Sequence, residues 1–388
     1  MSLTPRFTAI DKAVLVATGN SFVVCGSTTA TGSNTSDMIK PDGSTTRDWA
    51  EAGSTANLNI LTNSTILYAE LLWYSTVKSN VQGAQDLRSI QDNSITFTTP
   101  KGSYQISPQY TDTNTGTSGT VDRYRAADVT SYIQNSLSGN YTVSNVPISV
   151  PETGLSNTRG GWTLSVVYRN DSLPPQKVIY LSGVSVAKPG SPLQTTISGF
   201  TTSSDISKLK GNVFIACANG EPINGNDFTY AGPSFAELSN IGNSVNSPNP
   251  NPGTSPNNPG NNFFSGLMNV VNPLNSSNGL LNINGTNGNN NHDGFVPTQK
   301  LGARNKWDIT NVDITKTLIP NQTLLAGQVN SAETGDGVQL LALGTQLNVN
   351  APNIIAKLDA YDIDGDGEYN IQVGEPLVYA LSIKMMGQ

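Results

Sequence analysis

Histidine and cysteine are nearly absent from this sequence. Of 388 residues, 1 is His and 2 are Cys. A single imidazole argues against the general bases of most hydrolases and against His-ligated zinc, and two thiols cannot build a disulfide framework. His292 stands in an Asn-rich stretch, NNNHDG, where it is expected to be exposed. We therefore predict that the protein is not an enzyme.

Charge is also scarce, above all positive charge. Asp, Glu, Lys and Arg make up 13% of the residues, and the net charge is -7. Nucleic-acid binding needs clustered Lys and Arg, so a nucleic-acid partner is excluded. No apolar run reaches the roughly 18 residues of a membrane span, which predicts no transmembrane segment. The first twenty residues lack the features of a secretory signal peptide, so export would follow a removed leader or another route.

Strand-forming alternation is what the sequence has in quantity. Thr, Val, Ile and aromatic residues recur at period two between Gly, Pro, Asn and Asp, and this predicts an all-β sandwich. Only residues 129–137 and 314–319 are expected to form single helical turns, capped by Asp128 and Asp313. Strands are expected at residues 21–25, 66–74, 95–98, 141–143, 162–168, 178–181, 213–218, 338–343 and 347–349.

The two halves of the chain contain similar segments in the same order. The first-half segments begin at Ile66, Asp92, Tyr124, Gly139 and Gly161, and their second-half partners at Gly211, Asn226, Trp307, Asn321 and Gly337. Five matches in register predict an internal duplication, with two tandem jelly-roll-like lobes at residues 1–190 and 191–352. The unequal spacing of the matches places an insertion in the second lobe, at about residues 243–293.

This insertion is rich in Asn, Pro and Gly. Such a composition buries too little apolar surface to offset its ordering entropy, which predicts a solvated loop. Its one apolar island, FFSGLMNVVNPL, supports a second interpretation, in which the island docks on a neighbouring subunit. The island residues with helical spacing that would make this contact are Phe263, Phe264, Leu267 and Met268.

Several motifs carry a family resemblance: ILYAELLWYST, YRAADVTSYIQ, RGGWTLSVVYRNDSLP, KWDITNVDITKTLIPNQT and QLLALGTQLNVNAP. Over about residues 6–352 the chain resembles the N-terminal region of surface proteins from spore-forming Gram-positive bacteria. Those proteins usually continue into copies of the conserved repeat domain of bacterial cell-surface proteins, an immunoglobulin-like β-sandwich. The resemblance implies an extracellular location at a spore or cell surface and a structural role. It brings no catalytic residues.

The last residues, 353–388, resemble only the first strands of that repeat domain. Within them, the segment from Asp362 to Asn370 resembles the start of an EF-hand calcium loop, with carboxylates at positions 1, 3 and 5 and Gly at position 6. Val373 stands where an EF-hand has Glu, so both a Ca2+ site and a plain acidic turn stay open. The calcium interpretation uses Asp362, Asp364 and Asp366 through carboxylates, Glu368 through its carbonyl group, and Asn370 or Glu375 to complete the shell.

The final segment, PLVYALSIKMM, alternates as a strand does. It places Leu377, Tyr379, Leu381 and Ile383 on one face. A lone strand leaves its backbone groups unpaired, so we expect it to pair with an edge of its own lobe, to add to the edge of the next subunit, or to stay disordered.

Two cysteines and two tryptophans lie in apolar strand segments. Cys25 and Cys217 are expected to be buried free thiols, and the alternative is a disulfide within or between subunits. Trp73 and Trp162 are expected in the core rather than as platforms for sugars.

These observations predict a structural, self-assembling surface protein, a subunit of a spore- or cell-surface filament or layer, whose partner is itself. One rival hypothesis is an adhesin that binds glycans through jelly-roll loops. A second rival is a viral capsid or tail protein, because tandem jelly rolls also serve there.

Overall fold

The computed structural model forms two compact units, residues 1–349 and 350–388. Strands dominate both, which confirms the all-β fold class. The structure describes residues 3–25, 36–42, 44–78, 87–115, 120–135, 137–150, 158–220, 227–242, 258, 260, 262–264, 268–271, 278–280, 307–331, 337–349, 353–362 and 377–386. Their helical elements are α1 (Thr130–Gln134), η1 (Arg88–Ile90), η3 (Ile206–Lys208) and η4 (Thr315–Thr317). None of these helices has the length and apolar character needed to cross a membrane.

The first sandwich pairs a five-stranded sheet with a four-stranded sheet, both antiparallel. Sheet I contains, in spatial order, β10 (Tyr110–Thr115), β11 (Thr120–Asp128), β7 (Thr65–Lys78), β13 (Gly160–Arg169) and β2 (Ala13–Ser21). Sheet II contains β6 (Gly53–Leu58), β12 (Gly139–Ser144), β8 (Ile95–Thr99) and β9 (Gly102–Ile106). A small third sheet contains β3 (Val23–Cys25), β4 (Ser36–Ile39) and β5 (Thr45–Thr46).

The second sandwich also has two sheets. Sheet III contains β1 (Thr4–Asp11), β14 (Gln176–Ala187), β23 (Val338–Asn348), β16 (Gly211–Ala218), β21 (Trp307–Asp313), β19 (Met268–Val271) and β20 (Asn278–Leu280). Sheet IV contains β15 (Leu193–Ser198), β22 (Leu324–Ser331), β17 (Asp227–Gly232) and β18 (Ser239–Asn240). The N-terminal strand β1 therefore pairs within the second sandwich, next to β14.

The two sandwiches have the same strand order. In sheets I and III the orders β11-β7-β13-β2 and β21-β16-β23-β14 correspond, and in sheets II and IV so do β6-β12-β8-β9 and β15-β22-β17-β18. The short helical turns are also capped alike, because Asp128 accepts a 2.9 Å hydrogen bond from the Thr130 amide and Asp313 a 2.7 Å bond from the Thr315 amide. These side-chain bonds are the predicted ones, although each Asp stands one residue before the N-cap, which is Val129 in α1 and Ile314 in η4. The common order agrees with the sequence matches, and common descent of the lobes stays a prediction.

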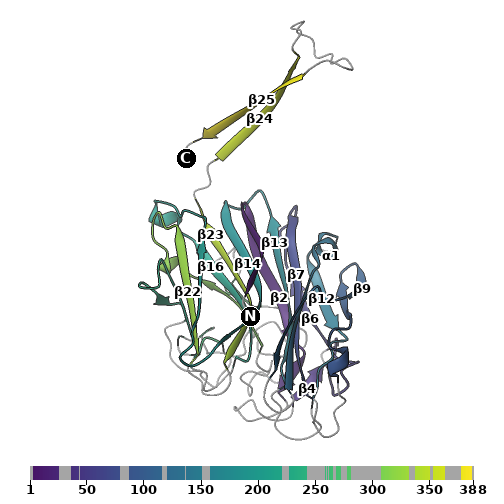
Figure 1. Ribbon diagram of the computed structural model, residues 1–388. Coiled ribbons are helices and arrows are strands. Elements are labelled where there is room, and N and C mark those ends of the chain that lie inside the picture. Colours follow the sequence, from purple (N-terminus) through teal and green to yellow (C-terminus); the bar gives the residue numbers. More distant parts are fainter. Residues whose placement is uncertain are drawn as a thin grey trace. The chain divides into compact units, whose positions relative to one another are not determined.

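The sandwiches stack through sheets I and III. Strand β2 of sheet I contacts β14, β21 and β23 of sheet III, and it contacts β6 of sheet II on its other side. Strand β14 contacts β15 and β22 of sheet IV. The layers therefore follow the order II, I, III, IV, and Figure 1 shows β22 at one side of this stack and β6 and β12 at the other. The largest core cluster, which includes the predicted core residues Trp73 and Trp162, runs from sheet II to the near face of sheet III.

Close contact between sheets I and III depends on a glycine. A Cβ atom at Gly161 would lie 2.3 Å from Cδ2 of Trp307, so only Gly fits there. Trp307 is fully buried and packs against Tyr74 with ring centroids 6.2 Å apart. The Tyr74 hydroxyl donates a 2.6 Å hydrogen bond to Oε1 of Gln339 across the same interface. Shape and a specific polar contact thus fix how the two sheets meet.

One carboxyl group is buried between the same two sheets. Glu70 of β7 is fully buried and accepts hydrogen bonds from the hydroxyls of Tyr68, at 3.0 Å, and Tyr180, at 2.9 Å. Nε of Arg6 lies 3.7 Å from the carboxylate. Burial raises the pKa of Glu70 above its ordinary value of 4.5, although the hydrogen bonds and Arg6 act in the opposite direction. The folded protein therefore holds this proton to a higher pH than the unfolded chain does.

This raised pKa makes stability depend on pH. The contribution of the protonated Glu70 is complete below pH 4.5 and is lost as pH rises through the folded pKa. We expect Glu70→Gln, which imitates the neutral acid, to show a smaller decline in free energy of unfolding between pH 4.5 and neutrality than the unsubstituted protein. Urea unfolding across that range measures the difference. Parallel curves for the two proteins would contradict the role assigned to Glu70.

Candidate functional site

The second compact unit contains a two-stranded antiparallel sheet. Strand β24 (Asn353–Asp362) pairs with β25 (Leu377–Met386) from Asn353↔Met386 to Asp362↔Leu377 without a register shift. The alternating pattern of the last segment thus forms a strand, and its partner is β24. Among the described residues no third strand pairs with either one. Both outer edges of this hairpin therefore lack a strand partner within the described part of the chain.

The register gives the hairpin two unlike faces. Positions 377, 379, 381 and 383 alternate with their neighbours along β25 and stand opposite 362, 360, 358 and 356 on β24. Apart from Asp362 these positions carry Leu, Tyr, Ile and Ala, whereas the other face mixes the polar residues Lys357, Asp359, Ser382 and Lys384 with apolar ones such as Ile355, Tyr361 and Val378. An isolated two-stranded hairpin is only marginally stable in water. We therefore expect another protein surface to cover its apolar face.

The predicted calcium residues belong to the segment that joins the two hairpin strands. Asp362 ends β24, and Asp364, Asp366, Glu368, Asn370 and Glu375 lie outside the described residues. In the part that is described, no group of three or more His, Cys, Asp and Glu residues is placed to hold a metal ion. Calcium binding by this segment stays a prediction.

Calcium binding would stabilise the hairpin. Crowded carboxylates repel one another without a cation, so we expect chelation to expose residues 353–388 to protease. At a free Ca2+ concentration one hundred times Kd, the ion would stabilise the bound form by about 2.7 kcal/mol. Asp364→Ala combined with Asp366→Ala should reproduce the effect of chelator, whereas Asp359→Ala, outside the loop, should not. An identical digestion pattern with and without chelator would contradict the predicted calcium site.

The apolar island of the insertion is part of this chain's own fold. Phe263 and Phe264 are fully buried, with ring centroids 5.0 Å apart. The Phe263 amide donates a 3.0 Å hydrogen bond to the Asp227 carbonyl, and Met268 begins β19, which extends sheet III beside β21. Leu267 lies outside the described residues. The expectation of a helical docking surface is therefore wrong for both phenylalanines, which are buried in this chain's own fold. Met268 lies in a strand and not in a helix, and its docking on a neighbouring subunit stays a prediction.

Part of the same insertion also contradicts the solvated-loop interpretation. Asn258 is buried; its Oδ1 accepts a 2.7 Å hydrogen bond from the Thr310 hydroxyl, and its Nδ2 donates a 3.0 Å bond to the Phe263 carbonyl. These bonds tie the segment to β21. Isolated apolar residues in an Asn-rich stretch were the sequence signal for this attachment.

Cys217 is a buried free thiol, as expected. Its Sγ contacts the Ala218 carbonyl oxygen at 3.2 Å, and burial raises the pKa of the thiol well above its ordinary value. Cys25 ends β3, and its side chain is outside the described part. Since Cys217 is free, no bridge within the chain joins it to Cys25, and a bridge between subunits stays a prediction.

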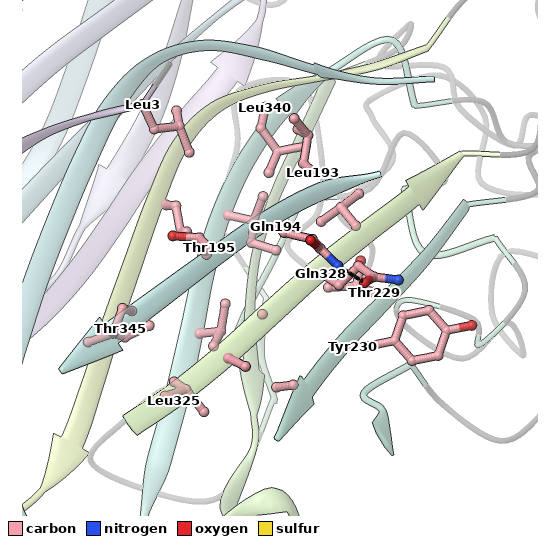
Figure 2. Close-up of a pocket in the computed structure, with 18 of the residues that line it drawn as sticks. Leu3, Leu193, Gln194, Thr195, Thr229, Tyr230, Leu325, Gln328, Leu340 and Thr345 are labelled. Carbon is pink, nitrogen blue, oxygen red and sulfur yellow. Dashed lines mark hydrogen bonds between the residues drawn. The ribbon is translucent and has the colours of Figure 1, made fainter. Parts of the chain in front are cut away.

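A cavity of about 170 Å³ lies between sheets III and IV of the second sandwich. Figure 2 shows its lining residues on strands of both sheets. Most are aliphatic, including Leu181, Ile215, Leu325 and Leu343. At one side, Nε2 of Gln194 donates a 2.7 Å hydrogen bond to Oε1 of Gln328 (Figure 2). The sequence analysis missed this site.

The cavity reflects small side chains on sheet IV. On sheet II, Phe97 and Tyr141 fill the first sandwich with rings whose centroids are 5.8 Å apart. On sheet IV, the lining positions of β17 and β22 include Thr229, Ala231 and Gly327. The smaller side-chain volume in the second sandwich becomes clear only when its strands are compared with the corresponding strands of the first.

Comparisons with known proteins add little. No family model and no curated protein matches the chain. A structure of infectious bursal disease virus Gx strain is 9% identical, with 90% of this chain and 74% of that chain covered and a TM-score of 0.18. A structure of the Gt strain is 11% identical, with 90% and 81% covered and a TM-score of 0.11. At these TM-scores the likeness carries no argument about fold or function.

Proposed function

We propose that this is a structural, self-assembling surface protein, a subunit of a filament or layer on a spore or cell surface. The observation that carries the proposal is the two-stranded hairpin β24–β25, with an apolar face and two outer edges that lack partners in the described chain. Such an edge is a template for another strand, and backbone hydrogen bonds across it give affinity. Subunits joined head to tail in this way form an open polymer if the contact does not close into a ring.

The sandwich unit supports the proposal by supplying a rigid subunit. Its layers share one core cluster from sheet II to sheet III, and Gly161 leaves the space that Trp307 fills between sheets I and III. A compact body whose copies are joined by strand addition is a suitable repeating unit. The single His and the net charge of -7 are consistent with a structural role.

Electron microscopy of the purified full chain tests the proposal. We expect filaments or sheets with a regular repeat, formed at increasing protein concentration. A protein that stays monomeric and binds immobilised glycans would favour the adhesin, and closed shells would favour the viral alternative. Either result would overturn the filament or layer proposal.

A further inference from the structure

The cavity in the second sandwich has the size of a site for one small ring. Its volume is about 170 Å³, and it is lined from both sheets, mainly by aliphatic side chains. Engineered protein cavities of about 150 Å³ with such linings stay dry and bind benzene. A long acyl chain would need a much larger space, so the volume favours a compact ligand.

Two fully buried hydroxyl groups in the lining have no hydrogen-bond partner in the described structure. The hydroxyls of Thr229, on β17, and Thr345, on β23, are buried without a hydrogen bond. Both residues line the cavity, and they come from its two facing sheets (Figure 2). Buried hydroxyls normally have a partner, so each of these is a group that a ligand can satisfy.

Of the other polar residues in the lining, Thr195 and Tyr230 carry further hydroxyl groups, and Oγ of Ser185 accepts a 3.2 Å hydrogen bond from the Leu3 amide. Gln194 and Gln328 bond to each other, and Nε2 of Gln328 also donates a 2.9 Å hydrogen bond to Oδ1 of Asn330. The lining, which consists of described residues alone, includes no Asp, Glu, Lys, Arg or His. A charged ligand would lose its hydration there without compensation.

We propose that the second sandwich binds a small neutral molecule with a ring-sized apolar body and a hydroxyl or carbonyl group, in the cavity between sheets III and IV. The aliphatic walls hold the apolar body, and Thr229 or Thr345 bonds the polar group. This site is independent of the assembly proposed for the hairpin.

Isothermal titration of the full chain with phenol, benzene and benzoate tests the site. Phenol combines a ring with one hydroxyl, benzene has the ring alone, and benzoate has a charge. We expect phenol to bind and to raise the melting temperature, benzene to bind about tenfold more weakly for want of one hydrogen bond, and benzoate not to bind. Failure of phenol to bind at millimolar concentration would overturn the proposal, as would equal binding of benzoate.

Two kinds of substitution locate the binding. Thr229→Val and Thr345→Val keep the side-chain shape and remove one hydroxyl each, and at least one should reduce phenol affinity to that of benzene. Gly327→Leu should abolish binding of both probes by filling the cavity, since a Cβ atom there meets its nearest neighbour, Cγ2 of Thr195, at an ordinary 3.5 Å. Thr196→Val, on an exposed position of β15, is the matched control and should bind phenol as the unsubstituted chain does. Phenol binding that survives Gly327→Leu would place the site elsewhere and overturn the proposal.

Discussion

Deletion of residues 353–388 is expected to leave a folded, soluble monomer that no longer assembles. The sandwich unit, residues 1–349, is compact by itself, and the strands removed pair only with each other among the described residues. Assembly should fall to the detection limit, while the near-ultraviolet circular dichroism of the buried tryptophans stays unchanged. Light scattering and electron microscopy measure the first effect. If the shortened protein forms filaments of normal length, or if it unfolds, strand addition by this hairpin is wrong.

Two neighbouring positions on β25 provide a sharper test of the same idea. Leu381 belongs to the apolar face of the hairpin, and Ser382 to the opposite face, by the register with β24. Leu381→Lys should prevent assembly because the face that another sheet must cover would carry a charge. Ser382→Lys adds the same charge to the opposite face, which already carries Lys357 and Lys384, and should assemble normally. Equal behaviour of the two variants would contradict burial of the apolar face in the polymer.

Gly161→Ala is expected to destabilise the whole sandwich unit, by about 1–3 kcal/mol or more. The added methyl group would lie 2.3, 2.5 and 2.7 Å from three atoms of the Trp307 ring, which has no room to retreat in a fully buried position. Because sheets I and III share one core cluster, we expect a single cooperative transition at a lower urea concentration. Gly327→Ala is the matched control, since its Cβ atom meets only ordinary contacts, and it should be neutral or stabilising.

A second substitution shows whether the clash with Trp307 is the cause. Trp307→Leu alone should destabilise the protein by leaving a void, and in combination with Gly161→Ala the two costs should not add. A coupling energy on the order of 1 kcal/mol or more is expected for residues in direct contact. Additive costs, or an unchanged stability of Gly161→Ala, would show that the sheets meet differently.

Local patterns predicted local elements. The alternation from Trp162 to Tyr168 lies within β13, and the Asp-x-Thr motifs make the expected side-chain bonds to the first amides of α1 and η4, because these features depend on neighbours in sequence. The predicted break between residues 343 and 347 is wrong, since β23 runs through it. Gly344 is required there because a Cβ atom would lie 2.1 Å from Cδ2 of Leu15, and Gln346 accepts a 2.9 Å hydrogen bond from the Leu15 amide. Contacts with the distant strand β2 thus require residues at positions 344 and 346 that are also typical of a turn, and this led to the wrong prediction.

The candidate sites were predictable to different degrees. The hairpin strand β25 followed from its alternation, but its partner β24 did not, since pairing is not local. The cavity consists of missing volume opposite small residues such as Thr229 and Gly327, and a sequence does not show which residues face one another. Of the features that were not predicted, Glu70 has the clearest sequence signal, because it is the lone acid in the apolar strand ILYAELLWYST.

The cavity also makes the two sandwiches unequal under hydrostatic pressure. Pressure favours the state of smaller volume, and unfolding eliminates internal voids, with volume decreases on the order of 20–100 mL/mol for folded proteins. The void of about 170 Å³ lies between sheets III and IV, whereas the core cluster shared by sheets I, II and III contains no described residue of sheet IV. Pressure should therefore separate sheet IV from sheet III first. The interface between sheets I and III, where Trp307 fills the space above Gly161, would lose little volume on unfolding and should stay folded to higher pressure.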